Sequence, residues 1–305
     1  MKHRNNYPLF FFVLMLSMVM GSHAQPTVSF TFDDGMLADF PEYSFEEWNN
    51  LLLQKLKEAD IKAMLFIAGR RKDTKRGTQL LSSWNNNGHF LANHTWKHHN
   101  YNNSAITFDI FAKDMLRGDS LLRTYSNFRK FFRFPYLKEG NTPQKIDAFR
   151  AFLKGNDYKN GYVTIDASDW YIDNRLVDRL KSNKTTDLDA YRDYYLQHIW
   201  ERAQFYENLS YELNGRHIKH TLLLHHNLLA ALFIDDLIKM FQEKGWKIVS
   251  AEEAFTDPIF GYTPRYAGES LIYAMAKDSG DFKNLLRYPA EDGRYEKEAM
   301  DRLGL

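Results

Sequence analysis

The sequence predicts an α/β fold, a distorted (β/α) barrel of about seven parallel strands with a long helical insertion between the fifth and sixth strands. Short apolar runs alternate with stretches whose apolar residues recur every three or four positions, as parallel strands alternate with crossover helices. No repeat or low-complexity linker divides the 305 residues, and this length supports one large domain with its own core.

Seven apolar runs are the expected strands. They cover residues 27–32, 62–67, 90–93, 131–134, 162–165, 220–224 and 247–250. Helical spacing between them is clearest over residues 45–59, 108–125, 142–153 and 232–244. The order of these elements is therefore strand, helix, strand almost throughout, which is typical of a parallel barrel.

The amino terminus predicts export. Lys2 and Arg4 precede an apolar stretch, and the small-residue pattern Gly21-Ser22-His23-Ala24 follows it, as in a secretory signal peptide over residues 1–24. The apolar stretch, residues 9–20, is too short to span a bilayer comfortably. We therefore expect a periplasmic or secreted protein without a membrane anchor.

Composition excludes some classes of function. The chain has no cysteine, so no disulfide or lipidated cysteine is expected. Removing residues 1–24 leaves 38 basic and 39 acidic residues, a near-neutral balance. A near-neutral chain carries no electrostatic footprint for nucleic acid or anionic membrane. No protein partner is evident from the sequence.

Two segments stand apart from the alternation. Residues 172–216 are long for a link between strands, and from Leu188 to Leu213 their apolar positions predict one long amphipathic helix. This insertion is interpreted as a cover for the barrel wall, or as a rim that shapes a groove. We expect residues 25–260 to form the barrel, and residues 261–305 to be an extension of unassigned role.

Polar clusters follow five of the predicted strands. They are Asp33-Asp34-Gly35, His94 to His98, Arg133 to Tyr136, Asp166 to Trp170, and His225-His226. Each cluster alone fits a turn, a satisfied histidine or a structural ion pair. In a parallel barrel, however, the carboxyl ends of the strands surround one site, so all five together predict an active site.

The residues and order of these clusters resemble those of the polysaccharide deacetylase family, the chitin deacetylase-like or NodB-homology carbohydrate esterases. The resemblance extends from about Val28 to Phe255. It is carried by the motifs TFDDG, HTWKH, RFPY, DASDW and LLLHH. Family members fold as a distorted barrel, and the resemblance implies hydrolysis of acetyl groups on sugars.

A metal site is the first expectation for these residues. One carboxylate and two imidazoles make a compact site for a divalent ion with open positions, so Asp34, His94 and His98 are the expected ligands. Zinc is the default ion, while cobalt, nickel or another divalent ion remains open. His99 adjoins His98, so a shift in register would exchange the second histidine.

The resemblance also implies catalytic roles. Asp33 would be the general base, oriented by Arg133, and the backbone N–H of Tyr136 would donate to the developing oxyanion. His225 would be the general acid, held by Asp169, with His226 as the alternative. Trp170 and Leu223 would line the space for the acetyl methyl group, and Thr95 would hydrogen-bond near the ligands.

The substrate and some alternatives stay open. An N-acetylglucosamine polymer or oligomer is the first expectation, and O-acetyl xylan or an exopolysaccharide is the alternative. A relative that cleaves another amide, an inactive carbohydrate-binding relative and a ferrous oxygenase are further possibilities. Asp33 and His225 argue against mere binding, and Arg133 argues against an oxygenase.

Overall fold

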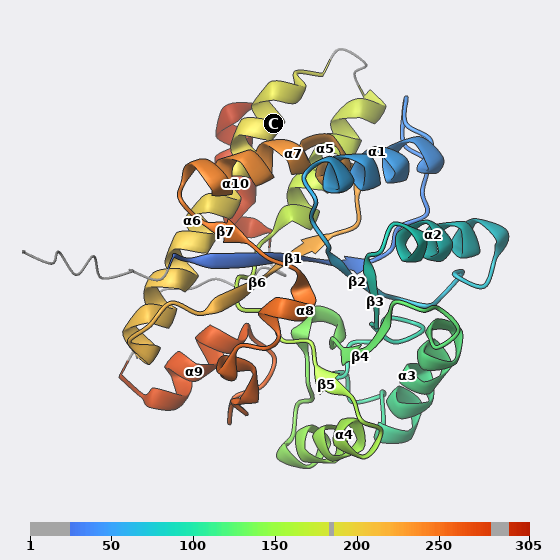
Figure 1. Cartoon of the computed structure of the whole chain (residues 1–305), viewed down its shortest axis with the longest axis vertical. Helices are drawn as coiled ribbons and strands as arrows, with labels where there is room; N and C mark the ends of the chain where they lie inside the picture. The colour runs from blue at the N-terminus through green and yellow to red at the C-terminus, as the bar shows by residue number, and fades with distance from the viewer. Residues whose placement is uncertain (1–24, 183–185, 282–292) are drawn as a thin grey trace, which may run out of the picture.

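A computed structural model describes residues 25–182, 186–281 and 293–305, so the predicted signal peptide lies outside the described residues. Seven parallel strands form one sheet in the order β5-β4-β3-β2-β1-β6, with β7 also beside β1. The sheet curls, and helices flank it (Figure 1). This arrangement confirms the predicted distorted barrel.

Within the described ranges, no helix has both the length and the apolar content needed to cross a membrane.

The elements have the following bounds. The strands are β1 (Thr27–Asp34), β2 (Met64–Ile67), β3 (Phe90–Asn93), β4 (Phe128–Phe132), β5 (Lys159–Asn160), β6 (Lys219–His225) and β7 (Lys247–Ile248). The α-helices are α1 (Phe45–Glu58), α2 (Lys75–Asn86), α3 (Phe108–Leu122), α4 (Pro143–Gly155), α5 (Asp169–Ser182), α6 (Leu188–Asn214), α7 (Leu228–Glu243), α8 (Ala251–Ala254), α9 (Leu271–Ser279) and α10 (Arg294–Leu303). Two 3₁₀ turns, η1 (Pro135–Leu137) and η2 (Pro258–Gly261), complete the described elements.

Strand β1 pairs with three other strands, β2, β6 and β7. Its side chains alternate, so Phe30 and Phe32 pack against the helix residues Phe241 and Trp84. On the opposite side Thr31 donates a hydrogen bond to the Leu222 carbonyl at 2.7 Å. This alternation sends Asp33 into the barrel interior at the end of the strand.

The barrel closes through an irregular segment. The sequence predicted a strand at residues 162–165, but β5 is shorter and earlier, and the following residues run along β6 through a single bridge between Ile165 and Leu222. The Gly161 N–H donates to the Phe132 carbonyl at 2.7 Å, which ties the segment to β4. A Cβ at Gly161 would lie 2.5 Å from the Phe66 ring, so the close approach requires glycine.

The insertion contains two helices. The predicted long amphipathic helix is α6, but a separate helix, α5, precedes it, so the prediction of one helix was incomplete. The Asp187 side chain caps α6 by accepting hydrogen bonds from the Asp189 and Ala190 N–H groups, which starts a new helix there. Helix α6 packs against α5, α7 and α9 and so covers the barrel wall.

The carboxyl-terminal extension folds back onto the insertion. Helix α9 contacts α6, and Arg175 of α5 forms an ion pair with Asp301 of α10 at 2.8 Å. The division into a barrel and an extension remains a prediction, since these helices share packing with the insertion.

Burial on α1 generates a stability prediction. Leu52 is fully buried in the core between α1 and its neighbours, whereas Leu116 of α3 is 39% exposed. Leu52→Ala is expected to lower the free energy of unfolding by about 2–5 kcal/mol, because it removes buried methyl groups and leaves a cavity. Urea denaturation measures this, with Leu116→Ala as the matched control expected to cost less than about 1 kcal/mol. Equal losses in both variants would contradict the packing of α1.

Candidate active site

The five predicted clusters converge on one pocket at the carboxyl ends of the strands. Its volume is about 360 Å³. The lining residues are Asp33, Asp34, His94, His98, Tyr136, Leu137, Asp166, Ala167, Trp170, Leu223 and His225. Barrel topology explains the convergence, since β1, β3, β4 and β6 all end at this rim.

Asp34, His94 and His98 form a cluster suited to a metal ion. The two histidine Nε2 atoms lie 3.1 Å apart. Asp34 Oδ1 lies 3.3 Å from the His98 Nε2 and 3.7 Å from the His94 Nε2. Three potential ligand atoms within 4.8 Å of one another can contact a single divalent ion.

The protonation states of the two histidines also suit metal binding. His94 Nδ1–H donates to the Arg133 carbonyl at 2.8 Å, which leaves Nε2 with its lone pair. Burial lowers the pKa of His94 to about 4, and burial together with His94 lowers that of His98 to about 4, so both rings are neutral near pH 7. The buried Asp34 Oδ1 accepts no hydrogen bond from any described residue. The residues therefore fit a divalent metal by donor type, charge state and an unsatisfied oxygen.

A loop, and not a helix, brings the two histidines together. Their spacing of four would place them on one face of a helix, but Thr95 and His98 both have left-handed backbones, with φ of 66° and 59°. The Asn93 side chain accepts from the Thr95 N–H at 2.8 Å, and the Thr95 hydroxyl accepts from the His98 N–H at 3.0 Å. Asp114 of α3 accepts from two further N–H groups of the loop. These hydrogen bonds stabilise a left-handed backbone conformation that is otherwise unfavourable for these residues.

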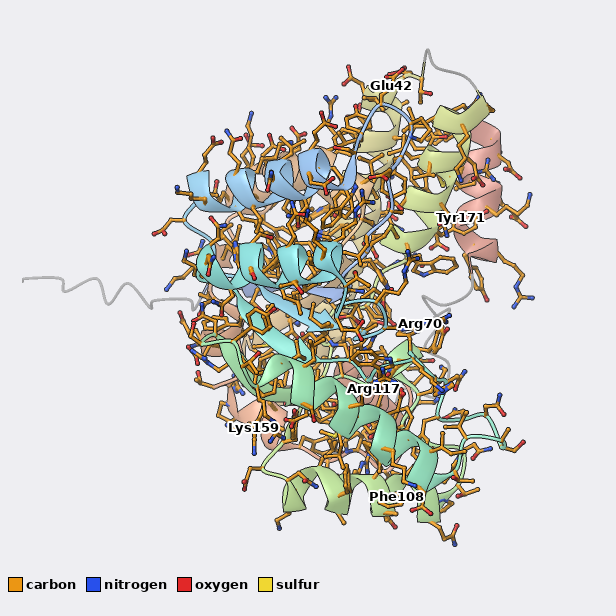
Figure 2. All side chains as sticks on the ribbon, turned by 90° about the vertical axis from the view of Figure 1, so that its right-hand side faces the viewer. Glu42, Arg70, Phe108, Arg117, Lys159 and Tyr171 are labelled. Carbon is orange, nitrogen blue, oxygen red and sulfur yellow. The ribbon has the colours of Figure 1, made fainter. Side chains whose placement is uncertain are left out.

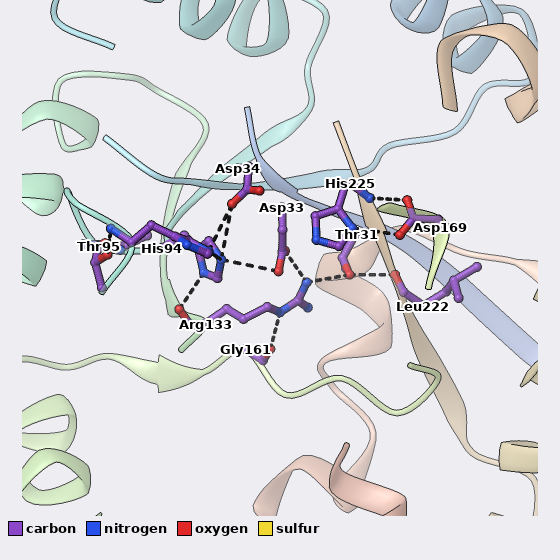
Figure 3. Close-up of polar contacts among 12 residues, drawn as sticks. Thr31, Asp33, Asp34, His94, Thr95, Arg133, Gly161, Asp169, Leu222 and His225 are labelled. Atoms are coloured by element: carbon purple, nitrogen blue, oxygen red, sulfur yellow. Dashed lines mark hydrogen bonds and ion pairs between the residues drawn. The ribbon is translucent and has the colours of Figure 1, made fainter. Parts of the chain in front are cut away.

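Asp33 and Arg133 form a buried ion pair beside the cluster. Arg133 donates from Nη1 to Asp33 Oδ1 at 2.6 Å and to the Thr31 hydroxyl at 3.0 Å, and from Nε to the Gly161 carbonyl at 2.9 Å (Figure 3). Burial raises the pKa of Asp33 above its usual value, although the Arg133 charge opposes the rise. The other carboxylate oxygen, Oδ2, lies 3.6 Å from the His94 Nε2.

His225 and Asp169 form a second pair on the other side of Asp33 (Figure 3). His225 Nδ1–H donates to Asp169 Oδ1 at 2.8 Å, and the His225 backbone N–H donates to Oδ2 at 2.7 Å. Burial would lower the pKa of His225, but the charge and hydrogen bond of Asp169, helped by Asp34 and Asp33, raise it to about 10. The ring therefore carries a proton near pH 7 in the metal-free protein.

The alternative histidines lie elsewhere. His226 is fully buried away from the pocket, where it contacts the Trp48 and Trp84 rings and donates from Nε2–H to the Asn49 Oδ1 at 3.0 Å. Alternation along β6 explains why adjacent histidines face opposite sides. His99 is absent from the metal-binding group found among the described residues.

The remaining predicted residues lie on the pocket wall. Trp170, in the first turn of α5, and Leu223 of β6 both line the pocket. Tyr136 has φ of 58°, and its ring packs 4.6 Å from the His98 ring between centroids. Sequence reasoning missed Leu137, and it quoted Asp166 and Ala167 without assigning them to the wall. The DASDW motif carried the signal for the latter two.

Comparison with known proteins agrees with the motifs. Residues 21–149 match the family model described as Polysaccharide deacetylase, which confirms the resemblance over the first three motifs. A search of curated proteins found no match.

Solved structures share the fold. A mutant of a CE4 family pseudoenzyme with restored enzymatic activity matches with a TM-score of 0.53 and 18% identity, over 76% of this chain and 68% of that one. The wild-type pseudoenzyme, from Bacillus anthracis, matches with a TM-score of 0.51 and 16% identity, over 76% and 66%. The Bc1960 peptidoglycan N-acetylglucosamine deacetylase matches with a TM-score of 0.50 and 19% identity, over 77% and 90%. At these identities the likeness is one of fold, and it includes both an enzyme and a pseudoenzyme.

The two adjacent histidines provide a test of the metal cluster. His98→Ala is expected to weaken zinc binding by at least about tenfold, because one of three ligands is lost. His99→Ala, which changes the neighbouring residue outside the cluster, should bind zinc as the parent does. Calorimetric zinc titration of the metal-free proteins measures both, and the reverse order of effects would move the ligand to His99.

The His225–Asp169 pair predicts a protonation state. Because Asp169 helps raise the pKa of His225, the ring should remain protonated at pH 8 in the metal-free protein and lose its proton there in Asp169→Asn. NMR spectra of the ring nitrogens against pH measure this. Asp173→Asn is the control, since Asp173 is buried on the same helix but hydrogen-bonds the Leu229 N–H instead of the ring. A His225 that titrates alike in all three proteins would refute the role of Asp169.

Proposed function

We propose that this chain is a metal-dependent hydrolase that removes acetyl groups from a carbohydrate. One observation carries the proposal: the three-residue metal cluster lines the same pocket as Asp33 and His225, and each of these two is paired with a buried partner, Arg133 or Asp169. A binding protein would need neither a buried carboxylate nor a protonated imidazole beside a metal. The deacetylase family match supports the same chemistry.

The first step uses Asp33. A divalent ion bound by Asp34, His94 and His98 would polarise the acetyl carbonyl and make a water molecule more acidic. Asp33 then takes the proton of the attacking water. Its raised pKa makes it a stronger base, and Arg133 fixes its orientation through the 2.6 Å hydrogen bond.

The oxyanion formed by this attack needs a donor. We assign the backbone N–H of Tyr136, which follows Pro135 in a left-handed turn at the pocket wall. Loss of a single oxyanion donor typically costs about 2.7–4 kcal/mol of transition-state stabilisation. Side-chain substitution cannot delete a backbone donor. A substitution here can act on the oxyanion only by changing the conformation of this turn.

The second step uses His225. Its Nδ1–H is engaged by Asp169, so Nε2 is the nitrogen that can give a proton to the departing amine or alkoxide. Asp33 then releases its proton to solvent or product and His225 takes one up, which restores both groups. Asp33 and His225 thus divide the work of base and acid between two separately held side chains.

The substrate we favour is an N-acetylglucosamine polymer or oligomer. Trp170 and Leu223 give the pocket an apolar wall where an acetyl methyl group would fit. O-acetyl xylan or an exopolysaccharide is the second candidate, because the same residues attack an ester as well as an amide. Zinc is the proposed ion, and export through residues 1–24 is the proposed route to such a polymer.

Asp33→Asn is expected to keep zinc binding and fold while turnover falls by about 10²–10⁴-fold, because the general base is lost. His94→Ala should lose both metal and turnover. Acetate release from residues 25–305 with added zinc measures turnover, using N-acetylglucosamine oligomers, peptidoglycan and acetylated xylan. The matched control is Asp189→Asn, an exposed aspartate of α6 that is paired with Arg192 outside the pocket and is expected to be fully active.

Full activity in Asp33→Asn would remove the assignment of the base. A zinc-loaded parent that releases no acetate from any of the three polymers, yet binds one of them, would instead favour a carbohydrate-binding role.

A further inference from the structure

A second groove adjoins the pocket. It has a volume of about 670 Å³ and shares Asp34 and His98 with the pocket, so the two form one continuous depression. Five cationic side chains line it, and we call it the basic groove. They are Arg70, Arg71, Lys72, Arg76 and Lys97. The acidic lining residues are Asp34 and Asp39, so positive charge dominates.

Three of the five cations are free to meet a ligand. Arg76 is paired with Asp39 at 3.0 Å and with Glu46 at 3.7 Å, and Lys72 is buried. Arg70, Arg71 and Lys97 are exposed, and no ion pair joins them to an acid in the part of the chain that the structure describes. Figure 2 shows Arg70 at the edge of the molecule. A concentration of unpaired cations is unexpected in a chain whose formal net charge is only +1.

The groove is held in place relative to the metal cluster. The loop after β2 donates from the Gly69 N–H to the Thr95 carbonyl at 2.9 Å and from the Arg70 N–H to the Trp96 carbonyl at 2.8 Å. The same loop turns back through a hydrogen bond from the Lys72 N–H to the Gly69 carbonyl at 2.9 Å. The cationic loop and the histidine loop are thus hydrogen-bonded to each other, which fixes the backbone of Arg70 relative to the metal cluster.

We propose that the basic groove binds an anionic group, a carboxylate or a phosphate, on a sugar near the one that is deacetylated. This inference rests on the proposed function and narrows its substrate to acidic glycans. A polymer with an acetylated sugar in the pocket would extend past Asp34 and His98 into the groove. Arginine there can hold an oxyanion through paired N–H donors, whereas a neutral glycan would leave these cations without a partner.

The test compares three probes of similar length on the zinc-loaded Asp33→Asn protein. They are chitin oligosaccharides, which are neutral, hyaluronan oligosaccharides, which carry carboxylates, and N-acetylglucosamine-substituted glycerol phosphate oligomers, which carry phosphates. We expect at least one anionic probe to bind about tenfold more tightly than chitin oligosaccharides at low salt, with the advantage falling as salt is added. The tighter anionic probe identifies carboxylate or phosphate. Equal binding of all three overturns the inference.

The variant Arg70→Gln/Arg71→Gln locates the effect. It should remove the preference for the anionic probe and leave chitin oligosaccharide binding unchanged. Lys57→Gln/Lys239→Gln is the matched control, which removes two exposed charges from α1 and α7 outside both depressions and should keep the preference. A preference that survives in the arginine variant overturns the inference.

Acetate release by the parent separates the two proposals. Release from neutral and anionic probes with equal kcat/KM keeps the deacetylase and overturns the groove. Tight anionic binding through Arg70 and Arg71 without acetate release from any probe keeps the groove and refutes the hydrolase.

Discussion

The buried guanidinium of Arg133 is the interaction on which the rest of the site depends. It is 1% exposed, and it joins the end of β1 to the segment that closes the barrel, through Asp33 and the Gly161 carbonyl. Its own carbonyl accepts a hydrogen bond from the His94 Nδ1–H, which sets the tautomer of that ring. Burying an ion pair costs desolvation energy, which the attraction between the charges offsets only when the geometry is good. We therefore explain this pair by the position it gives to Asp33, and not by a gain in stability.

Backbone strain is concentrated around the same pocket. Asp34, Thr95, His98 and Tyr136 all have positive φ without being glycine. Each such residue costs roughly 1–3 kcal/mol, and it persists only where the surroundings hold it. Here the Asn93 and Thr95 side chains supply the holding bonds, and these residues lie behind the ligands instead of in the pocket. The core of the barrel therefore stabilises the arrangement that the chemistry needs.

The pocket separates the proposed base from the proposed acid by environment. Asp33 meets a fixed cation in a buried position, and His225 meets a fixed carboxylate, Asp169. Each titratable group is thus held by a partner of opposite charge that does not face the pocket centre. Similarity of fold to both a deacetylase and a pseudoenzyme means that the fold alone does not decide turnover. In this chain the side chains proposed to carry the chemistry lie at the strand ends.

The sequence by itself determined the fold class and the identity of the clusters, because strand periodicity and the position of polar residues after each strand are local properties. It also favoured His225 over His226, since adjacent residues of a strand face opposite sides. The fifth strand was misplaced because its closing contact with β6 is long-range and leaves little local periodicity around Gly161. The prediction named helical spacing only from Leu188 to Leu213, so it missed α5, in which Ile172, Leu176 and Leu180 are buried at the same spacing.

Only the tertiary structure decided how the histidines meet and what surrounds them. Their loop is held by Asn93 and Asp114, which no spacing rule connects to His94 and His98. Four of the five cations of the basic groove stand within residues 70–76, but only the tertiary structure places them, together with Lys97, beside Asp34 and His98. Local patterns determine which residues end each strand, whereas the curl of the sheet determines which of those residues become neighbours.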